Sequence, residues 1–202
     1  QWRYIGIAVA IACLGLVLAI AMKPYRVFRV IGFVDPELKI VRTINPEWAD
    51  DYEAQNKKSR RDAGYQVKQS VVAIGTGGLT GVGLMEGKQK LLYLPEAHTD
   101  FIFAVIGEEL GFLGTSAALL LFLVIAWRGV RIFLRTDDLF GKYLALGITA
   151  LIVFQALMNI SVVLGIAPTK GIPLPMVSYG GSSLLSSLIC FCMLLSVSEQ
   201  AN

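Results

Sequence analysis

Charged residues are scarce in this sequence. Lys, Arg, Asp and Glu make up 16% of its 202 residues, whereas about a quarter of the residues in a typical soluble domain are charged. Hydrophobic residues reach 55%. The low charge content excludes an ordinary soluble domain and predicts an integral membrane protein.

Cysteine is also rare, with three residues in the chain: Cys13, Cys190 and Cys192. All three lie in apolar runs, and none has the spacing of a zinc site or of a disulfide framework. We interpret them as small hydrophobic residues.

Four apolar runs are candidates for transmembrane helices, because about 20 apolar residues in a helix cross a hydrocarbon core of roughly 30 Å. They cover residues 4–22, 101–127, 143–166 and 182–198. The sequence therefore predicts an all-α polytopic helical bundle with about four transmembrane helices. It opens on Gln1 rather than Met, so we interpret it as a fragment of a longer protein.

The connection between the second and third predicted spans is short and basic. It carries four cations: Arg128, Arg131, Arg135 and Lys142. Because short basic loops stay on the cytoplasmic side, the long loop over residues 23–100 and the loop over residues 167–181 are predicted to be extracytoplasmic. The charge-dense stretch 37–62 is typical of a solvated loop, and a partner-binding patch is the less favoured alternative.

Polar residues gather where the long loop meets the second predicted span. Glu96, His98, Thr99 and Asp100 stand together there. In one interpretation, Thr99 or Asp100 is the N-cap of the following helix and is favoured by the helix dipole. In the other, the headgroup region partly desolvates the Asp100 carboxylate, which raises its pKa and suits it to take a proton from a hydroxyl. A cap can also be a base, so both interpretations stay open.

Two further carboxylates, Glu108 and Glu109, fall inside the second predicted span. A carboxylate at that depth is costly unless it meets water or a partner. Both are therefore expected to face the protein interior, with a shallow position near the interface as the alternative. Gly107, Gly111 and Gly114 follow at helical spacing and predict a face for close helix packing.

Five glycines occur within the nine residues 75–83. They weigh against an isolated helix, but they permit positive φ and close approach to a ligand or to another helix. The spacing fits neither the dinucleotide-binding fingerprint nor the phosphate loop of nucleotide-binding proteins. We therefore exclude nucleotide binding.

The segment 165–183, between the last two predicted spans, holds three prolines and one cation, Lys170. The prolines exclude a continuous helix, and irregular backbone at this depth is tolerated where it lines a wet cavity. Lys170 is a candidate to neutralise a phosphate, although snorkelling to the interface is the common role of such a lysine. In the preceding span, Gln155 and Asn159 are predicted to be interhelical hydrogen-bond donors.

Several motifs resemble the SEDS family, the shape, elongation, division and sporulation proteins of bacteria. The resemblance rests on five stretches: Gly64–Ser70, Gly75–Gly83, Tyr93–Gly111, Pro168–Gly171 and Ser178–Ser183. It covers nearly the whole chain, and it is closer to the cell-division members than to the elongation members. The charged stretch 37–62 is longer than the family pattern leads us to expect.

The resemblance implies a ten-span enzyme of the bacterial inner membrane that polymerises lipid II into peptidoglycan glycan strands at the division septum. Its implied partners are a class B penicillin-binding transpeptidase, other divisome proteins and membrane lipid, with no nucleic acid. On this pattern the chain is the C-terminal part of one polytopic membrane domain, spans seven to ten. We expect the isolated chain to be inactive, because the first six spans contribute part of the cavity.

The resemblance also implies the site. The family's essential aspartate matches Asp100, which would take the proton of the acceptor hydroxyl. We assign substrate-binding or supporting roles to seven further residues: Glu96, His98, Lys170, Ser178, Gly180, Gly181 and Ser182. No metal ligand is assigned. The leaving diphosphate needs a counter-charge, for which Lys170, another basic residue or a divalent cation, Mg²⁺ or Mn²⁺, are candidates.

Two other functions stay open from the sequence. A lipid II flippase would use the buried carboxylates and a polar cavity to guide a headgroup across the membrane without forming glycosidic bonds. A non-catalytic division scaffold would recruit the transpeptidase and use Asp100 only as a helix cap.

Overall fold

The computed structural model describes residues 66–88, 98–168 and 170–200 without interruption, and before them positions 4, 6, 7, 10, 11, 13–15, 42, 43 and 46. The chain divides into two compact units, Gln1–Ala63 and Gly64–Asn202. The long helices and the candidate site belong to the second unit. The predicted span over residues 4–22 and the charged stretch 37–62 lie largely outside the described residues.

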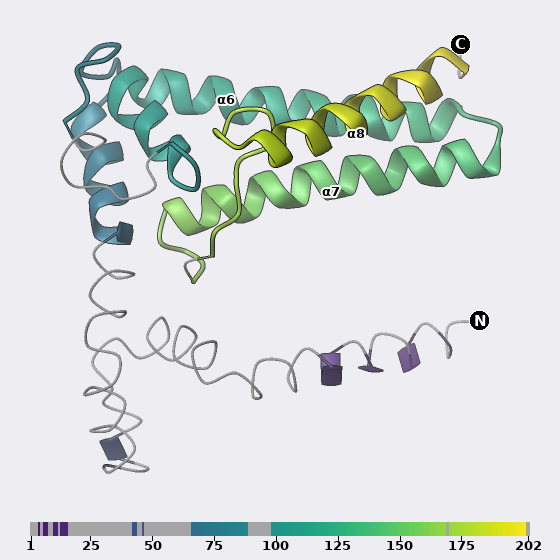
Figure 1. Cartoon of the computed structure of the whole chain (residues 1–202), viewed down its shortest axis with the longest axis horizontal. Helices are drawn as coiled ribbons and strands as arrows, with labels where there is room; N and C mark the ends of the chain where they lie inside the picture. Colours follow the sequence, from purple (N-terminus) through teal and green to yellow (C-terminus); the bar gives the residue numbers. More distant parts are fainter. Residues whose placement is uncertain are drawn as a thin grey trace. The chain divides into compact units, whose positions relative to one another are not determined.

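Three long helices make up most of the second unit: α6 (Ile102–Arg135), α7 (Leu139–Val163) and α8 (Gly181–Gln200). Each is long and apolar enough to cross a membrane. They lie side by side, and α7 packs against both α6 and α8 (Figure 1). The described residues contain no strand, and the prediction of an all-α helical membrane fold is confirmed for them.

Helix α6 continues beyond the predicted span over residues 101–127. It ends at Arg135, and Thr136 leaves the helix in an extended conformation. No proline interrupts this stretch, and arginine is a good helix former. The basic residues that end the hydrophobic run therefore do not end the helix.

Helix α7 begins and ends earlier than the predicted span over residues 143–166. It begins earlier because the Asp138 carboxylate caps it, accepting a hydrogen bond of 2.7 Å from the Gly141 N–H. It ends at Val163 because Gly165 has a φ of +73° and turns the chain out of the helix. Both differences arise from capping, which hydrophobicity alone does not reveal.

Helix α8 contains the whole of the predicted span over residues 182–198. The segment between α7 and α8 forms turns and bends, with no helix or strand among its described residues. Its three prolines predict this irregular course, and the prediction is confirmed.

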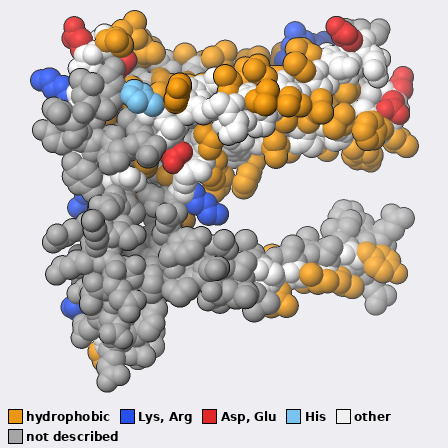
Figure 2. All heavy atoms as spheres, viewed as in Figure 1, with side chains coloured by type: hydrophobic (Ala, Val, Ile, Leu, Met, Phe, Trp, Pro, Cys, Tyr) orange, Lys and Arg blue, Asp and Glu red, His pale blue; other side chains and the backbone are white. Residues whose placement is uncertain are grey.

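The outer faces of the helices are apolar. Large hydrophobic side chains are exposed on all three, among them Phe112, Leu120, Leu151, Phe154 and Leu185. Figure 2 shows hydrophobic side chains along the helices, with charged side chains gathered toward the ends of this unit. A long helix that is apolar on its exposed side as well as its buried side is typical of a membrane span.

Small residues allow α6 and α7 to pack closely. Ala104 on α6 and Ala145 and Ala156 on α7 are buried in the core. Gly129 of α6 faces Thr149 of α7 so closely that a Cβ on the glycine would overlap the threonine hydroxyl. Such contacts are typical of membrane helices, where small side chains bring the backbones together.

Helix α6 is kinked near its start. Gly111 has φ +66° and ψ −158°, which lies outside the helical region. In an unbroken helix the N–H groups of Phe112 and Leu113 would donate to carbonyls four residues earlier. They donate instead to Gly78 O and Leu79 O, at 2.9 and 3.2 Å, so the glycine-rich segment supplies acceptors at the kink.

The same segment also supplies donors. The carbonyls of Glu108 and Glu109, which the kink removes from the helical ladder, accept hydrogen bonds from the N–H groups of Val82 and Gly83, at 3.0 and 3.2 Å. Two intrahelical hydrogen bonds are thus replaced by four bonds between α6 and the glycine-rich segment. We call this contact, made by residues 77–83 with residues 107–113, the glycine interlock.

The glycine interlock depends on the absence of side chains. A Cβ on Gly77 would overlap the Gly107 carbonyl oxygen, and one on Gly81 would overlap the Glu109 carbonyl oxygen. A Cβ on Gly111 would overlap the backbone nitrogen of Gly81. Gly81 also has a φ of +81°, which glycine adopts without strain.

The glycine interlock bears on two expectations from the sequence, one about the glycine-rich segment and one about the glycines of α6. The glycine-rich segment 75–83 approaches a helix, α6, through residues 77–83. The predicted packing face through Gly107, Gly111 and Gly114 is wrong as a continuous helical face, because Gly111 is not helical. Gly107 packs against Ile74 of the helix over residues 66–77, where a Cβ would stand 2.8 Å from Ile74 Cγ1.

Candidate functional site

The turn before α6 carries Thr99 and Asp100. Residues 98–101 form this turn, and Phe101 is the N-cap of α6. Phe101 makes no side-chain cap hydrogen bond. The interpretation of Thr99 or Asp100 as the N-cap is therefore wrong, because the turn places both before the position from which a side chain reaches the first free N–H groups.

The segment between α7 and α8 holds this turn through its backbone carbonyls. The Tyr179 N–H donates to His98 O at 2.9 Å. The Ser178 hydroxyl donates to Thr99 O at 2.5 Å, and it accepts from the Leu174 N–H at 2.7 Å. Two successive residues of the turn are thus bound to one irregular segment.

The next residue of the turn is bound to α7. Asn159 Nδ2 donates to Asp100 O and to Ile172 O, both at 2.7 Å. One helical turn earlier, Gln155 Nε2 donates to Pro173 O at 2.9 Å. Both amides are donors as predicted, but the prediction that they bond other helices is wrong. Their acceptors are carbonyls of irregular backbone, which has no helical ladder to satisfy it.

Gly171 lies against the Asp100 carboxylate. A Cβ on Gly171 would stand 2.9 Å from Asp100 Oδ2 and 3.7 Å from Cγ, so any larger residue would press on the carboxylate. Lys170, the next residue toward the N-terminus, is exposed. The structure therefore brings Asp100 together with the backbone that carries Lys170.

The remaining predicted site residues take different positions. Glu96 lies outside the described residues, and His98 is exposed. Ser178 is buried, and its hydroxyl supports the turn through the two bonds given above. Residues 180–182 lead into α8, where Ser182 is exposed in the first helical turn.

Glu108 is buried, with 3% of its surface exposed. Its Oε1 accepts a hydrogen bond of 2.8 Å from the Lys88 N–H, and Gly87 packs against the same carboxylate. The predicted inward orientation is confirmed for this residue, whereas Glu109 is partly exposed. Glu108 therefore contacts Gly87 and Lys88, which follow the glycine-rich segment. It does not belong to the candidate site.

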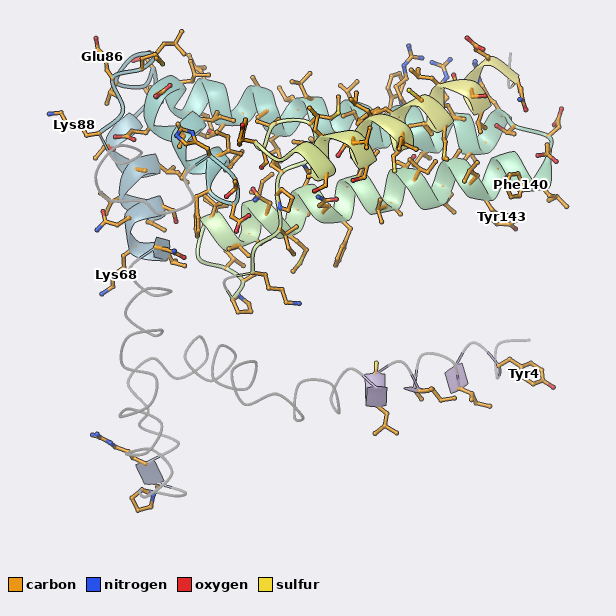
Figure 3. All side chains as sticks on the ribbon, in the orientation of Figure 1. Tyr4, Lys68, Glu86, Lys88, Phe140 and Tyr143 are labelled. Atoms are coloured by element: carbon orange, nitrogen blue, oxygen red, sulfur yellow. The ribbon has the colours of Figure 1, made fainter. Side chains whose placement is uncertain are left out.

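The basic connection between α6 and α7 lies at the far end of the helices. The candidate site occupies the N-terminal end of α6 and the C-terminal end of α7. Figure 3 shows Glu86 and Lys88 at one end of the unit and Phe140 and Tyr143, which follow the connection, at the other. The basic residues from which the membrane topology is predicted are therefore separated from the candidate site by the length of the helices.

Cations at this far end stack on aromatic rings. The guanidinium carbons of Arg128 and Arg131 lie 5.9 and 5.6 Å from the centroid of the Trp127 ring. Lys142 Nζ lies 5.0 Å from the centroid of the Phe133 ring. Aromatic rings beside basic residues are typical of a membrane interface.

Within residues 66–88, 98–168 and 170–200, no three His, Cys, Asp or Glu residues lie together as the ligands of one metal ion would. The divalent cation that the sequence analysis admits therefore stays a prediction, with no set of ligands among these residues. Cys13, Cys190 and Cys192 are free thiols.

The sequence does not predict two contributions to the site. Gly171 lies against the Asp100 carboxylate, and the sequence feature that points to it is the neighbouring Lys170 in a proline-rich segment. Asn159 fixes the Asp100 backbone. The sequence feature that points to it is the pair of amides that it forms with Gln155, one turn apart in an otherwise apolar helix. In both cases the signal indicates a contact but does not identify the partner.

Comparison with known proteins gives a consistent match. The family model for FtsW, RodA and SpoVE, described as "Cell cycle protein", matches residues 1–202. A probable peptidoglycan glycosyltransferase FtsW of Geobacter sp. (strain M18) is 45% identical over 190 residues, which cover 94% of this chain and 46% of the relative. The stage V sporulation protein E of Bacillus subtilis (strain 168) is 43% identical over 196 residues, covering 97% and 47%.

A solved structure supports the fold. A chain from work on the structural coordination of polymerization and crosslinking by a peptidoglycan synthase complex superposes with a TM-score of 0.65 at 25% identity, covering 99% of this chain and 50% of that one. The chain spans about half the length of the curated relatives it matches. The relatives and the apolar helices together identify a membrane protein.

Proposed function

Because the chain belongs to the cell cycle protein family of FtsW, RodA and SpoVE, we propose that the full-length protein is a peptidoglycan glycosyltransferase. It polymerises lipid II into glycan strands during cell division. Relatives at 43–46% identity carry the name probable peptidoglycan glycosyltransferase FtsW. The observation that carries the proposal is the fixed turn that holds the Asp100 carboxylate against Gly171, next to Lys170.

In this function Asp100 is the general base. It takes the proton from the 4-hydroxyl of an acceptor N-acetylglucosamine as that oxygen attacks the anomeric carbon of the donor. The glycosidic bond forms while the bond from that carbon to the diphosphate oxygen breaks, and undecaprenyl diphosphate leaves with the electron pair. General-base assistance typically supplies about 10²–10⁴-fold in rate.

The geometry of the turn supports this role. The carbonyl oxygens of His98, Thr99 and Asp100 are all hydrogen-bonded, so the backbone that carries the carboxylate is fixed before substrate arrives. A base that is held in place does not lose conformational freedom on reaching the reactive geometry, and this lowers the barrier to proton transfer. Gly171 contributes no side chain that would block the carboxylate.

Lys170 is the candidate to neutralise the leaving diphosphate. It is exposed and adjoins the glycine that touches Asp100. A divalent cation, Mg²⁺ or Mn²⁺, would supply the same counter-charge if the protein binds one. Stabilising charge that develops on the leaving group is a large term in transfer reactions of this kind.

Replacing Lys170 with glutamine is expected to lower the polymerisation rate by about 10–100-fold, since one charge-assisted hydrogen bond is worth roughly 1.5–3 kcal/mol. The measurement is the rate of glycan formation by the full-length protein. Lys68→Gln is the matched control, because Lys68 is an exposed lysine on the helix over residues 66–77. An equal rate loss in both variants would remove Lys170 from the site.

We place the protein in the bacterial inner membrane, at the division septum, with Asp100 on the extracytoplasmic side. The support is the separation between the candidate site and the basic end, where Arg128 and Arg131 stack on Trp127. Short basic connections stay in the cytoplasm, so the opposite end faces outward, where lipid II is polymerised.

A class B penicillin-binding transpeptidase is the proposed partner, with other divisome proteins and membrane lipid. The support is the similarity to a chain of a peptidoglycan synthase complex that coordinates polymerization and crosslinking. Glycan strands that leave the site need crosslinking, so a transpeptidase beside the polymerase receives its substrate directly.

The test is incubation of purified lipid II with the full-length protein and its transpeptidase partner, followed by separation of the products by length. The proposal predicts long glycan strands. Translocation of labelled lipid II across vesicles with no new glycosidic bond would favour a flippase. A protein that binds the transpeptidase but produces neither result would be a scaffold.

A further inference from the structure

We infer that Asn159 is a positioning residue for the base, because its side-chain amide fixes the backbone of Asp100 to α7 and to the segment that carries Lys170. The inference rests on the proposed function of Asp100. It assigns to the reaction a residue of the membrane-spanning helix α7 that does not itself reach substrate.

Asn159 is the point at which three parts of the chain meet. Its side chain is buried, with 1% exposed, and it projects from the last two turns of α7. Its two N–H hydrogens reach Asp100 O, before α6, and Ile172 O, before α8, each at 2.7 Å. One planar amide therefore sets the distance between the turn and the segment.

The orientation of this amide is determined by its partners. Both acceptors are carbonyl oxygens, so the nitrogen and not the oxygen of the side chain must face them. Asn159 Oδ1 is buried and has no hydrogen-bond partner within the described residues. A buried acceptor of this kind costs stability, whereas a hydrophobic side chain of similar shape would not carry that cost. The contribution of the amide is therefore the two bonds that it donates.

The other hydrogen bonds described above hold different carbonyls of the turn. Tyr179 and Ser178 bind the carbonyls of His98 and Thr99, whereas Asn159 binds the carbonyl of Asp100. The carbonyl of Asp100 and its side chain share one Cα, so loosening the carbonyl lets the carboxylate move relative to Gly171.

Gln155 offers a matched control one turn away on the same helix. Its amide donates to Pro173 O at 2.9 Å, so it holds the same irregular segment but not the turn. Removing it tests the loss of a polar bond between α7 and that segment. Removing Asn159 adds the loss of the bond to Asp100.

The experiment compares Asn159→Leu and Gln155→Leu in the full-length protein, with polymerisation kinetics on purified lipid II and hydrogen exchange of peptides from residues 98–105. For Asn159→Leu we expect kcat to fall about 10–100-fold, since small misplacement of a catalytic group costs this much, with KM changed less than about threefold. Exchange in this peptide should rise. Gln155→Leu should lower kcat less than about threefold and leave that exchange unchanged.

A second variant guards against failure to fold. Asn159→Ser keeps a hydroxyl donor in a smaller side chain, and it is expected to fall between wild type and Asn159→Leu in kcat. Wild-type kcat in Asn159→Leu would overturn the inference. So would equal losses of kcat and of melting temperature in the Asn159 and Gln155 variants, because a merely structural role predicts that result.

Failure of the proposed function is recognised separately. If Asp100→Asn keeps the wild-type rate, the base assignment fails and the positioning role fails with it, whatever the Asn159 variants do. If Asp100→Asn is inactive while Asn159→Leu has wild-type kcat and unchanged exchange, the base assignment stands and the inference about Asn159 is wrong.

Discussion

Asp100→Asn in the full-length protein is expected to lower the rate of glycan polymerisation by about 10²–10⁴-fold, the range that a general base supplies. Asparagine has nearly the same size as aspartate but cannot take the proton. The bond to Asn159 uses the carbonyl oxygen of residue 100, so the substitution leaves it intact. Asp100 is not the N-cap of α6, and loss of capping therefore cannot produce the effect.

The control for this variant is Asp137→Asn. Asp137 is an exposed carboxylate in the connection between α6 and α7, at the far end of the helices. It should keep the wild-type rate within about twofold, since it touches neither the turn nor the segment before α8. Wild-type polymerisation by correctly folded Asp100→Asn would return the flippase and scaffold functions to consideration.

Gly81→Ala is expected to destabilise the folded protein by roughly 2–4 kcal/mol, through left-handed backbone and overpacking together. Its φ of +81° is unfavourable for alanine, and the added Cβ would overlap the Glu109 carbonyl oxygen. That carbonyl is backbone in the kinked part of α6, so it cannot move aside as a flexible side chain would. The measurement is the melting temperature of the purified full-length protein, together with its yield in the membrane fraction.

Gly75→Ala is the matched control for the glycine interlock. Gly75 lies in the helix over residues 66–77, and a Cβ there meets nothing within 4 Å. Alanine is the better helix former by up to about 1 kcal/mol, so this variant should be as stable as wild type or more so. Equal melting temperatures for Gly81→Ala and Gly75→Ala would contradict the glycine interlock.

The sequence predicts the long helices well because their signal is local. Each hydrophobic run contains enough apolar residues to cross a membrane, and the runs predicted for α6, α7 and α8 are all found as helices. Their ends are less predictable. Asp138 sets the start of α7 through a hydrogen bond to its carboxylate, and Gly165 sets the end through its positive φ. Neither feature changes the hydrophobicity of the run.

The glycine interlock shows a limit of a different kind. Gly107, Gly111 and Gly114 stand at helical spacing and predict a packing face. That prediction uses only residues within α6. The non-helical Gly111 depends on a segment about 30 residues earlier, which exchanges hydrogen bonds with the broken ladder. A pattern within α6 cannot reveal a partner that lies outside it.

At the candidate site, too, the residues are predicted from the sequence but their distant contacts are not. Asp100 and Lys170 are predicted from charge beside apolar helices and from the family resemblance, and the structure places the Asp100 carboxylate against Gly171, the residue after Lys170. The bonds of Asn159 and Ser178 to the turn join residues 59 and 79 positions apart. Such distant pairs depend on how the helices pack, so the sequence identifies the residues but does not reveal which of them are in contact.

The most direct test of the account is to find where lipid II lies. Lipid II with a photoreactive group next to its diphosphate would be crosslinked to the full-length protein during polymerisation, and the adducts mapped by mass spectrometry. We expect adducts within residues 98–101 and 170–172, competed away by unlabelled lipid II. Adducts confined to other parts of a protein that is actively polymerising would contradict it.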